Sequence, residues 1–371
     1  EFKKQRYNKF YANVGYHNVG FPDSTWLFGA TFDFHDFRDQ YSKVEDRFCF
    51  NAYGEKRILG YTKVGANVLA DVNARTSDLA AHSNTVISII PYIKETRENW
   101  EAAAKLNLTL DNGASFKPYF YPTISFTYML ANRTLMPYVE ISGHHQVNTY
   151  EGLAYENPYL SSQNSLDIEN TKNKVSFIGG IKGRHRSSYG CNIWVSYSFI
   201  DDMYFYVNDI DWLSPSNLEN SFFLAYSGAN VFSFNTELAL KPTRSLDINF
   251  TYSFNSYNLD NNQVPFEGAF HKALNRPKHN LLIQMRYDIW SKITCNLDFG
   301  LKGSYYARRG ATFEPVKRGA GIDLSIGTEY KFFNSSSVFI QLNNITDSRY
   351  HVYNSYRTYG FNVVFGYMYA F

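Results

Sequence analysis

The stretch LDINFTYSFN at residues 246–255 alternates strictly between apolar and polar side chains. Its even-numbered positions carry Leu, Ile, Phe, Tyr and Phe, and its odd-numbered positions carry Asp, Asn, Thr, Ser and Asn. Successive side chains of a β-strand point to opposite faces, so this strand has one apolar face and one polar face. An aqueous lumen accepts a charged face that the core of a β-sandwich would not. The stretch therefore predicts a strand with lipid on one side and water on the other.

The same period of two recurs along the chain, at 63–73, 101–111, 232–241, 281–288, 322–331 and 361–371. These segments are about ten residues long, close to the roughly 9–11 residues that cross the hydrocarbon core, whereas soluble strands average about five or six. The 31 Tyr and 31 Phe cluster at strand ends, as at Tyr204 and Tyr206. Interfacial aromatic girdles produce such clustering. The sequence predicts an all-β fold, a closed antiparallel transmembrane β-barrel in the outer membrane of a Gram-negative bacterium.

Composition excludes several other classes of protein. No stretch approaches 18 consecutive apolar residues, so helical membrane spans are excluded. The formal net charge of +2 gives no argument for a nucleic-acid partner. Cys49, Cys191 and Cys295 are too few and too scattered for a disulfide framework or a metal cluster. Because no nucleophile elbow, phosphate loop or dinucleotide motif is present, we predict no enzyme activity, no catalytic residue, no cofactor and no metal.

The connections between the predicted strands alternate between short and long, and the predicted long connections include 36–46. Short turns are periplasmic and long loops extracellular in outer-membrane barrels, which orients the chain. We predict one domain over 1–371 with about sixteen strands, in a range of roughly 14 to 18, and an even number places both ends in the periplasm. Residues 1–22 form either a periplasmic segment or an extra strand, since 8–18 alternate weakly. With that extra strand the chain would begin outside the cell.

A barrel of this size leaves an aqueous channel unless something fills it. The candidate lumen-lining residues carry charges of both signs and are Glu237, Lys241, Asp247, Arg286, Glu329 and Lys331. They form either a self-paired, hydrated wall or the path of a solute. A bacterium does not tolerate a wide open hole, so we expect a filler. It is an inward-folded loop such as 147–173 or 256–278, a separate plug, or a protein partner.

Three charged clusters raise the question of a ligand. The acidic cluster comprises Asp201, Asp202, Asp209 and Asp211, for which a solvated loop is favoured over a calcium site. The basic cluster comprises Arg308, Arg309, Lys317 and Arg318, which either contact anionic lipopolysaccharide or belong to a merely soluble loop. His144 and His145 lie near Glu140 without a second ligand pair at suitable spacing, which favours a structural role over a metal site.

Several passages follow one another in the order found in a known family. The passage ENPYLSSQNSLDIENTKNKVSFIGGIKGR at 156–184 is similar to NPxLxPExSxxxExGxK, with Asn157, Pro158 and Leu160 matching and Ser162-Gln163 replacing Pro-Glu. Further similar passages lie at 194–207, 225–242, 246–257, 274–289 and 339–371. Together, residues 115–371 resemble the barrel of TonB-dependent outer-membrane receptors. That family also has a plug domain, an energy-transducer box and about 22 strands, and we find none of these matched here.

The C-terminal strand resembles the barrel-assembly signal of outer-membrane proteins. The chain ends in Phe371, with Tyr369 two positions and Gly366 five positions before it. Val364 stands where the signal usually has a polar residue. The resemblance implies that the barrel-assembly machinery is a partner and that outer-membrane lipid and lipopolysaccharide surround the barrel.

Three functions follow from this reading and remain open. The first is a plugless barrel subunit or scaffold of an outer-membrane transport, secretion or assembly complex, with a partner in the lumen. The second is implied by the resemblance: the barrel of a receptor that imports iron chelates, cobalamin-like compounds or glycans. The third is a diffusion porin.

Overall fold

The structure is a computed structural model of the chain. It describes residues 5–18, 26–77, 81–112, 116–161, 168–185, 188–208, 221–260, 272–308, 315–333 and 335–370. Most of these residues lie in strands, and the one helix among them, α1 (Tyr150–Glu156), has seven residues. No helix in the described ranges has the length and apolar character needed to cross a membrane.

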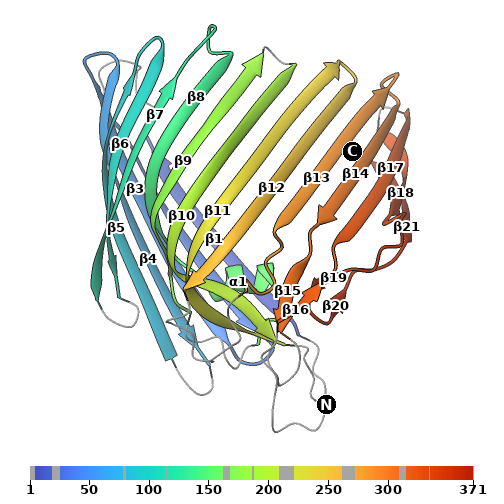
Figure 1. Cartoon of the computed structure of the whole chain (residues 1–371), viewed down its shortest axis with the longest axis horizontal. Coiled ribbons are helices and arrows are strands. Elements are labelled where there is room, and N and C mark those ends of the chain that lie inside the picture. Colours follow the sequence, from blue (N-terminus) through green and yellow to red (C-terminus); the bar gives the residue numbers. More distant parts are fainter. Residues whose placement is uncertain are drawn as a thin grey trace.

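The strands follow one another along the chain with few interruptions (Figure 1). They are β1 (Tyr7–His17), β2 (Leu27–Asp39), β3 (Val44–Ile58), β4 (Thr62–Thr76), β5 (Ala81–Thr96), β6 (Trp100–Asp111), β7 (Lys117–Tyr128), β8 (Leu135–Gln146), β9 (Thr171–His185), β10 (Tyr189–Asn208), β11 (Phe222–Thr243), β12 (Leu246–Asp260), β13 (His279–Ile289), β14 (Ile293–Lys302), β15 (Tyr305–Arg308), β16 (Pro315–Arg318), β17 (Gly321–Phe333), β18 (Ser336–Asn343), β19 (His351–Tyr353), β20 (Tyr356–Arg357) and β21 (Asn362–Tyr369).

One antiparallel sheet of 17 strands forms the wall of the barrel. Each of these strands pairs with its neighbour in sequence, from β1 with β2 to β18 with β21. The sheet curves around an interior, and the strands are strongly tilted (Figure 1). Two short hairpins, β15–β16 and β19–β20, lie outside this sheet in the connections that precede β17 and β21. The predicted all-β barrel fold is confirmed.

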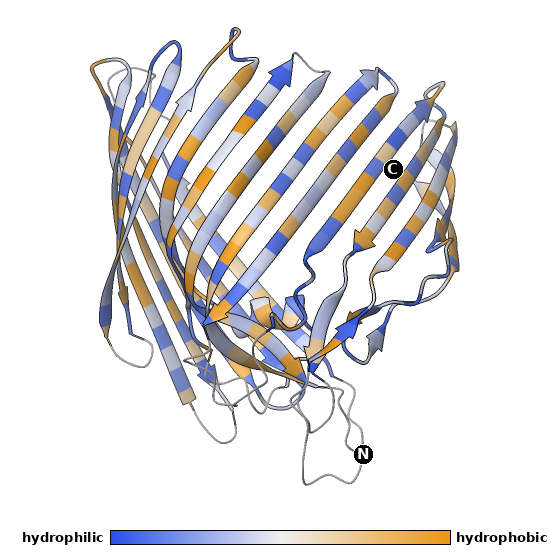
Figure 2. Ribbon diagram, in the orientation of Figure 1, coloured by the Kyte–Doolittle hydropathy of each residue, from blue (hydrophilic) through white to orange (hydrophobic). Residues whose placement is uncertain are grey.

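Alternating hydropathy marks the two faces of the wall. Figure 2 shows apolar and polar residues in turn along β12 and β13. Cross-strand partners share a face, and Ile248 lies opposite Leu240 and Met285. Asp247 lies opposite Arg286 on the other face. Because apolar residues such as Ile248 lie opposite apolar partners, the register keeps these side chains together on the lipid side.

The number of strands exceeds the expected sixteen by one and stays within the expected range. The weakly alternating segment forms β1, whose eleven residues pair with β2 from Tyr7 opposite Asp39 to His17 opposite Gly29. With 17 strands, the expectation that both ends lie in the periplasm is wrong for the described strands. Tyr7 lies at the end with the long connections, and Tyr369 lies at the end with the short turns.

The prediction of a long loop at 36–46 is also wrong. β2 continues to Asp39 and β3 begins at Val44, so only residues 40–43 connect them. The Asp39 carboxylate accepts hydrogen bonds from the backbone N–H groups of Tyr41 and Lys43 at 2.8 and 2.9 Å. A side chain that bonds to the backbone two residues ahead stabilises a tight turn in place of a loop.

Candidate functional site

The lumen contains a cavity of about 1270 Å³ on the wall formed by β8 to β14, β17, β18 and β21. Its charged lining residues are Lys182, Arg184, Lys241, Asp247, Arg286, Asp298 and Glu329. They are interleaved with amides such as Asn192, Asn249 and Gln284. This wall carries four cations and three carboxylates, so it offers hydrogen bonds and charges of both signs to a solute.

The structure places four of the six candidate lumen residues around this cavity, namely Lys241, Asp247, Arg286 and Glu329. The other two do not border it. Glu237 lies on β11 opposite Asn192 and Thr251. Lys331 lies near the end of β17 opposite Ser337. Being on the polar face of a strand therefore does not by itself bring a residue to the cavity.

Some of the lining charges pair with neighbours. Lys241 Nζ lies 2.8 Å from Asp247 Oδ1, and an Arg286 guanidinium nitrogen lies 3.3 Å from Asp288 Oδ1. The side chains of Lys241 and Arg286 keep more than half of their surface exposed. Exposed pairs of this kind contribute at most about 1 kcal/mol. Their charges therefore remain accessible to a solute in the lumen.

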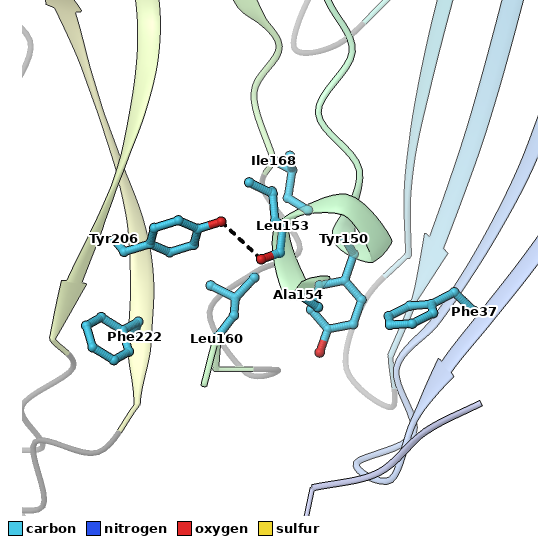
Figure 3. Close-up of a cluster of buried hydrophobic side chains, with 8 residues drawn as sticks. All are labelled: Phe37, Tyr150, Leu153, Ala154, Leu160, Ile168, Tyr206 and Phe222. Carbon is cyan, nitrogen blue, oxygen red and sulfur yellow. Dashed lines mark hydrogen bonds between the residues drawn. The ribbon is translucent and has the colours of Figure 1, made fainter. Parts of the chain in front are cut away.

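A second feature lies at the long-loop end, where residues 147–161 form what we call the α1 segment. Thr149 caps α1, and its hydroxyl accepts a hydrogen bond from the Gly152 N–H at 3.0 Å. The helix lies between the β2 wall on one side and the β10–β11 wall on the other (Figure 3). Of the two loops expected to fill the lumen, the described part of 147–173 that contains α1 therefore folds inward. Residues 261–271 of the other fall outside the described ranges.

Glu45 of β3 anchors the start of α1 to the wall. Its carboxylate is 1% exposed and accepts hydrogen bonds from the N–H groups of Tyr150 and Glu151, each at 2.7 Å. Asn73 of β4 donates a third hydrogen bond to it at 3.0 Å. The first N–H groups of a helix have no partner within the helix, and its N-terminus favours a negative charge. Glu45 satisfies both requirements from a distant part of the chain.

Glu151 and Tyr150 make further contacts with the same wall. The Glu151 carboxylate pairs with Lys9 of β1 and lies 3.0 Å from His35 Nδ1 of β2. The Tyr150 hydroxyl donates a hydrogen bond to Asp39 Oδ2 at 2.9 Å. Strands β1 to β4 thus all contribute to holding the first turn of α1.

The end of α1 is attached to the opposite wall by tyrosine hydroxyls. Tyr206 of β10 donates to the carbonyl of Leu153 at 3.0 Å (Figure 3). Tyr353 of β19 donates to the carbonyl of Glu156 at 2.6 Å. Tyr204 donates to the Glu156 carboxylate at 2.6 Å. Carbonyls at a helix end have no partner within the helix, and Tyr353 supplies one to Glu156, while Tyr206 adds a second donor to Leu153, whose carbonyl also accepts from the Asn157 N–H.

Apolar packing joins the two walls through the α1 segment. The buried cluster comprises Phe37, Tyr150, Leu153, Ala154, Leu160, Ile168, Tyr206 and Phe222 (Figure 3). Phe37 comes from β2, whereas Tyr206 and Phe222 come from β10 and β11. Each buried aromatic or aliphatic side chain of this size stabilises the packed state by about 1.5–3 kcal/mol. The α1 segment is therefore a cap held between two sides of the barrel.

Lys43 gives the cap a dependence on pH. Its side chain is fully buried, and Nζ lies 3.9 Å from the centre of the Tyr150 ring. Burial, assisted by the like charge of Arg75, lowers the pKa of Lys43 to about 7, although the Glu45 and Asp39 carboxylates oppose this shift. Below pH 7 the ammonium is charged in both the folded and the unfolded state, so the cost of burying it is constant.

Stability is expected to rise with pH between about 7 and the ordinary value of 10.5, because the unfolded state binds the additional proton in this range. The slope reaches at most about 1.4 kcal/mol per pH unit for one group. Thermal unfolding of the wild type and Lys43→Met across this range measures it. The difference in Tm between the two should change steadily with pH, and a constant difference would contradict the assignment.

The charged clusters are largely occupied by local partners. Lys174 pairs with Asp201 at 2.8 Å and Lys172 with Asp202 at 2.5 Å, while Asp209 and Asp211 lie outside the described residues. In the basic cluster, Arg308 is 4% exposed and so is not available to a lipid headgroup. Arg318 binds the Asn354 side chain and Lys317 is exposed, while Arg309 lies outside the described residues.

Both ring nitrogens of His145 lie close to polar groups of the barrel wall. Its Nδ1 lies 3.1 Å from the Tyr121 hydroxyl, and its Nε2 lies 3.0 Å from Asp111 Oδ2. Asn170, which directly precedes β9, donates a hydrogen bond to the same Asp111 carboxylate at 3.1 Å. This bond links the residue before β9 to the wall at β6. Among the described residues no group of three His, Cys, Asp or Glu side chains is arranged to hold a metal ion. The three cysteines are free.

The residues of the predicted assembly signal lie on the last strand. Gly366 and Tyr369 belong to β21, and Phe371 lies outside the described residues. Gly366 faces the Phe339 ring of β18, where an added Cβ would lie 2.7 Å from ring carbons. The glycine at this position therefore has a packing role in addition to its proposed part in the signal.

Comparison with known proteins places this fold. No family model matches the sequence, and no curated protein matches it. The chain is similar to the siderophore receptor PiuA from Acinetobacter baumannii, with 12% identity and a TM-score of 0.67, over 98% of this chain and 64% of that one. It is similar to the ferric-catecholate import receptor Fiu from E. coli K12, with 10% identity and a TM-score of 0.68, over 99% and 64%.

A third similar structure is the FrpB iron transporter from Neisseria meningitidis, with 8% identity and a TM-score of 0.71, over 98% of this chain and 63% of that one. The chain thus spans less than two thirds of the length of these proteins. Two of the three are described as receptors and the third as an iron transporter. The predicted resemblance and the outer-membrane barrel fold are confirmed: this chain has the fold of the barrel of TonB-dependent receptors.

Proposed function

We propose that this chain forms much of the wall of an outer-membrane uptake channel for a metal chelate. The observation that carries this proposal is a cavity of about 1270 Å³ in the lumen, lined by charged residues of both signs, together with a packed cap at the long-loop end. A cavity of this volume is large enough for a small-molecule ligand. A cap that contacts two walls separates such a cavity from the outside until a solute displaces it.

The chemistry of the wall supports a polar, charged solute. Lys182, Arg184 and Arg286 place cations beside the cavity, and amides supply further hydrogen bonds. Metal chelates with oxygen donors carry negative charge, which such a wall attracts. The similar structures include receptors described as siderophore, ferric-catecholate and iron transporters, and we extend that class of solute to this chain as part of the proposal.

Binding of defined chelates tests the proposal. Ferric catecholate, ferric hydroxamate and cobalamin probes are titrated against the protein in detergent, with quenching of its tyrosine and tryptophan fluorescence as the readout. We expect saturable binding of one class. Arg184→Gln should weaken it about fivefold, because one partly solvated charge contact contributes about 1 kcal/mol. Arg57→Gln, on β3 and outside the cavity lining, is the matched control and should bind normally.

A strain without the gene gives the second arm of this test. We expect it to grow more slowly when the bound chelate is its only source of the metal. Absence of saturable binding together with unchanged growth would overturn the proposal. Steady conductance of the isolated protein in a planar bilayer would then indicate a diffusion porin.

A scaffold role is the second candidate, and one observation favours it. Among the described strands, β1 pairs only with β2 and β21 only with β18, so both are edge strands able to pair with other polypeptide. Extraction of the native protein in mild detergent distinguishes the two roles. Stoichiometric protein companions without chelate binding would support the scaffold.

The C-terminal residues are proposed to act in assembly. Phe371→Ala is expected to reduce the folded protein in the outer membrane several-fold, because the resemblance to the assembly signal places its aromatic terminus at that position. The measurement is the fraction of heat-modifiable protein in isolated outer membranes. Phe365→Ala removes a lipid-facing ring from the same strand and is the control. Equal loss in both variants would refute a specific role for Phe371.

A further inference from the structure

We propose that the lumen cavity takes an elongated dipolar solute, with the chemistry of a short peptide that has a free carboxylate at one end and a free ammonium at the other. This deepens the function proposed above by naming the chemical class of the solute, a chelate whose organic part is such a chain. It rests on that function in taking the cavity as the path of the solute. One row of neighbouring side chains across the wall carries the inference.

The register of the sheet defines this row. Each member lies directly opposite the next on the neighbouring strand, so all of them share the lumen face. From β9 to β14 the members are Arg184, Gly190, Ala239, Asn249, Gln284 and Asp298. All of them border the cavity. The row therefore begins with a cation and ends with a carboxylate, and two small residues and two amides lie between these charges.

The charges at the two ends of the row are available to a solute. Arg184 pairs with no carboxylate of the described residues. Asp298 accepts a hydrogen bond from the Gln284 amide at 3.1 Å and pairs with no cation in the described ranges. Charges nearer the short turns are balanced instead, since Lys241 Nζ lies 2.8 Å from Asp247 Oδ1. The wall thus presents uncompensated charge at the two ends of the row.

Two further lining residues give the two sides of the cavity opposite charge. Lys182 lies two residues from Arg184 on β9, with its Nζ 4.5 Å from the centre of the Tyr138 ring. Glu329 lies on β17, the strand that pairs with the strand of Asp298. The lining is thus cationic along β9 and anionic along β14 and β17. A solute with charge of only one sign would be attracted by one side and repelled by the other.

The middle of the row fits an extended chain of amides. Arg184 and Asp298 are separated by five strand spacings of about 4.8 Å each, about 24 Å along the curved wall (Figure 1). An extended peptide of six residues spans about 20 Å, and the two charged side chains cover the remainder. A Cβ added to Gly190 would meet only a backbone oxygen at 4.0 Å, so there is room above this position. Asn249 and Gln284 each offer a donor and an acceptor, which a peptide backbone requires.

The order of the charges determines the orientation of the solute. The guanidinium of Arg184 has the geometry to donate two parallel hydrogen bonds to a carboxylate, whereas Asp298 accepts hydrogen bonds from an ammonium. The carboxylate of the solute therefore lies at β9 and its ammonium at β14. The reverse orientation would bring like charges together at both ends.

Three peptides that differ only at their ends test the inference. A soluble hexapeptide of alternating serine and alanine is used with both ends free, with its amino end acetylated, and with its carboxyl end amidated. Binding to the protein in detergent is measured by isothermal titration calorimetry. Loss of either terminal charge is expected to weaken binding about fivefold, the effect of one partly solvated charge contact.

Two conservative variants assign each end of the peptide to its residue. In Asp298→Asn, acetylation should have no further effect, while amidation should still weaken binding about fivefold. In Arg184→Gln, amidation should have no further effect and acetylation should keep its own. The matched controls are Asp323→Asn on β17 and Arg57→Gln on β3, both outside the cavity lining, and they should behave as the wild type.

Equal binding of the three peptides by the wild type would overturn the inference. An effect of acetylation that persists in Asp298→Asn, or an effect of amidation that persists in Arg184→Gln, would overturn the assignment of the row. Absence of binding of the free peptide at millimolar concentration would also overturn the inference. Binding of ferric chelates is a separate titration, so failure of the proposed function and failure of this inference are distinct results.

Discussion

Replacing Glu45 with alanine is expected to release α1 from the wall and to open the cap at the long-loop end of the barrel. The buried carboxylate accepts two backbone hydrogen bonds from the first turn of α1 and one from Asn73. Alanine leaves these three donors without a partner. It also removes a carboxylate that lies close to the buried ammonium of Lys43 and offsets its charge. We expect the local free energy of opening to fall by about 3 kcal/mol, a change of about a hundredfold in the opening equilibrium.

Hydrogen exchange at the amides of residues 150–154 measures this change directly. Glu45→Ala should lose protection there while the amides at the short-turn ends of β12 and β13, residues 246–249 and 284–287, keep theirs. Conductance in planar bilayers provides a second readout, because opening the cap admits ions to the lumen. Glu45→Gln retains one acceptor oxygen at the same position, so it should lie between the wild type and Glu45→Ala.

Unchanged protection of residues 150–154 in Glu45→Ala would show that apolar packing alone holds the cap. In that case Tyr206→Phe is informative, since it removes only the hydroxyl that donates to Leu153 and keeps the ring in the cluster. Its expected cost is about 1 kcal/mol, the contribution of one hydrogen bond.

Two neighbouring positions of β12 are expected to lose very different amounts of stability on the same substitution. Phe250 belongs to the apolar face, whereas Asn249 lines the lumen cavity. An arginine on the lipid face near the middle of the bilayer costs about 2–4 kcal/mol, and an arginine in an aqueous lumen keeps its hydration. Phe250→Arg should therefore lower the stability of the barrel by about 3 kcal/mol, and Asn249→Arg should change it by less than about 1 kcal/mol.

The measurement is denaturant unfolding of both variants in lipid vesicles, followed by tryptophan fluorescence. Phe250→Leu is the control for loss of the ring without a charge. Similar destabilisation by the two arginines would mean that β12 does not separate lipid from water. A larger effect at Asn249 would mean that the two faces have been assigned the wrong way round.

The face of each strand was predictable because it depends on a local property of the backbone. The alternation of LDINFTYSFN is set by the period of two, and Figure 2 shows it in β12. β1 was uncertain for the same reason, since its weaker alternation places Asn13 and Gly15 on the polar face and leaves little contrast. The turn at 40–43 was missed because its stability depends on hydrogen bonds of one side chain, Asp39, rather than on a pattern.

The cap could not be derived in this way. The loop 147–173 was one of several possible fillers, and nothing in its own residues selects it. Glu45 lies 105 residues from Tyr150 in the sequence, and Tyr353 lies 197 residues from Glu156. Contacts at such separations form only after the sheet has curved and brought β3, β10 and β19 around a common interior. A carboxylate on β3 has no local signature that distinguishes it from any other polar residue of a strand.

The sequence by itself determined the all-β class, the membrane, the two faces of the wall and the approximate number of strands. These follow from side-chain alternation and from strand length, which act within about ten residues. The tertiary structure decided which charged residues border the cavity, which loop packs between the two walls and which of the described strands are left at the edges. Those outcomes depend on how 17 strands curve and pair, because each is a relation between segments that are distant in the chain.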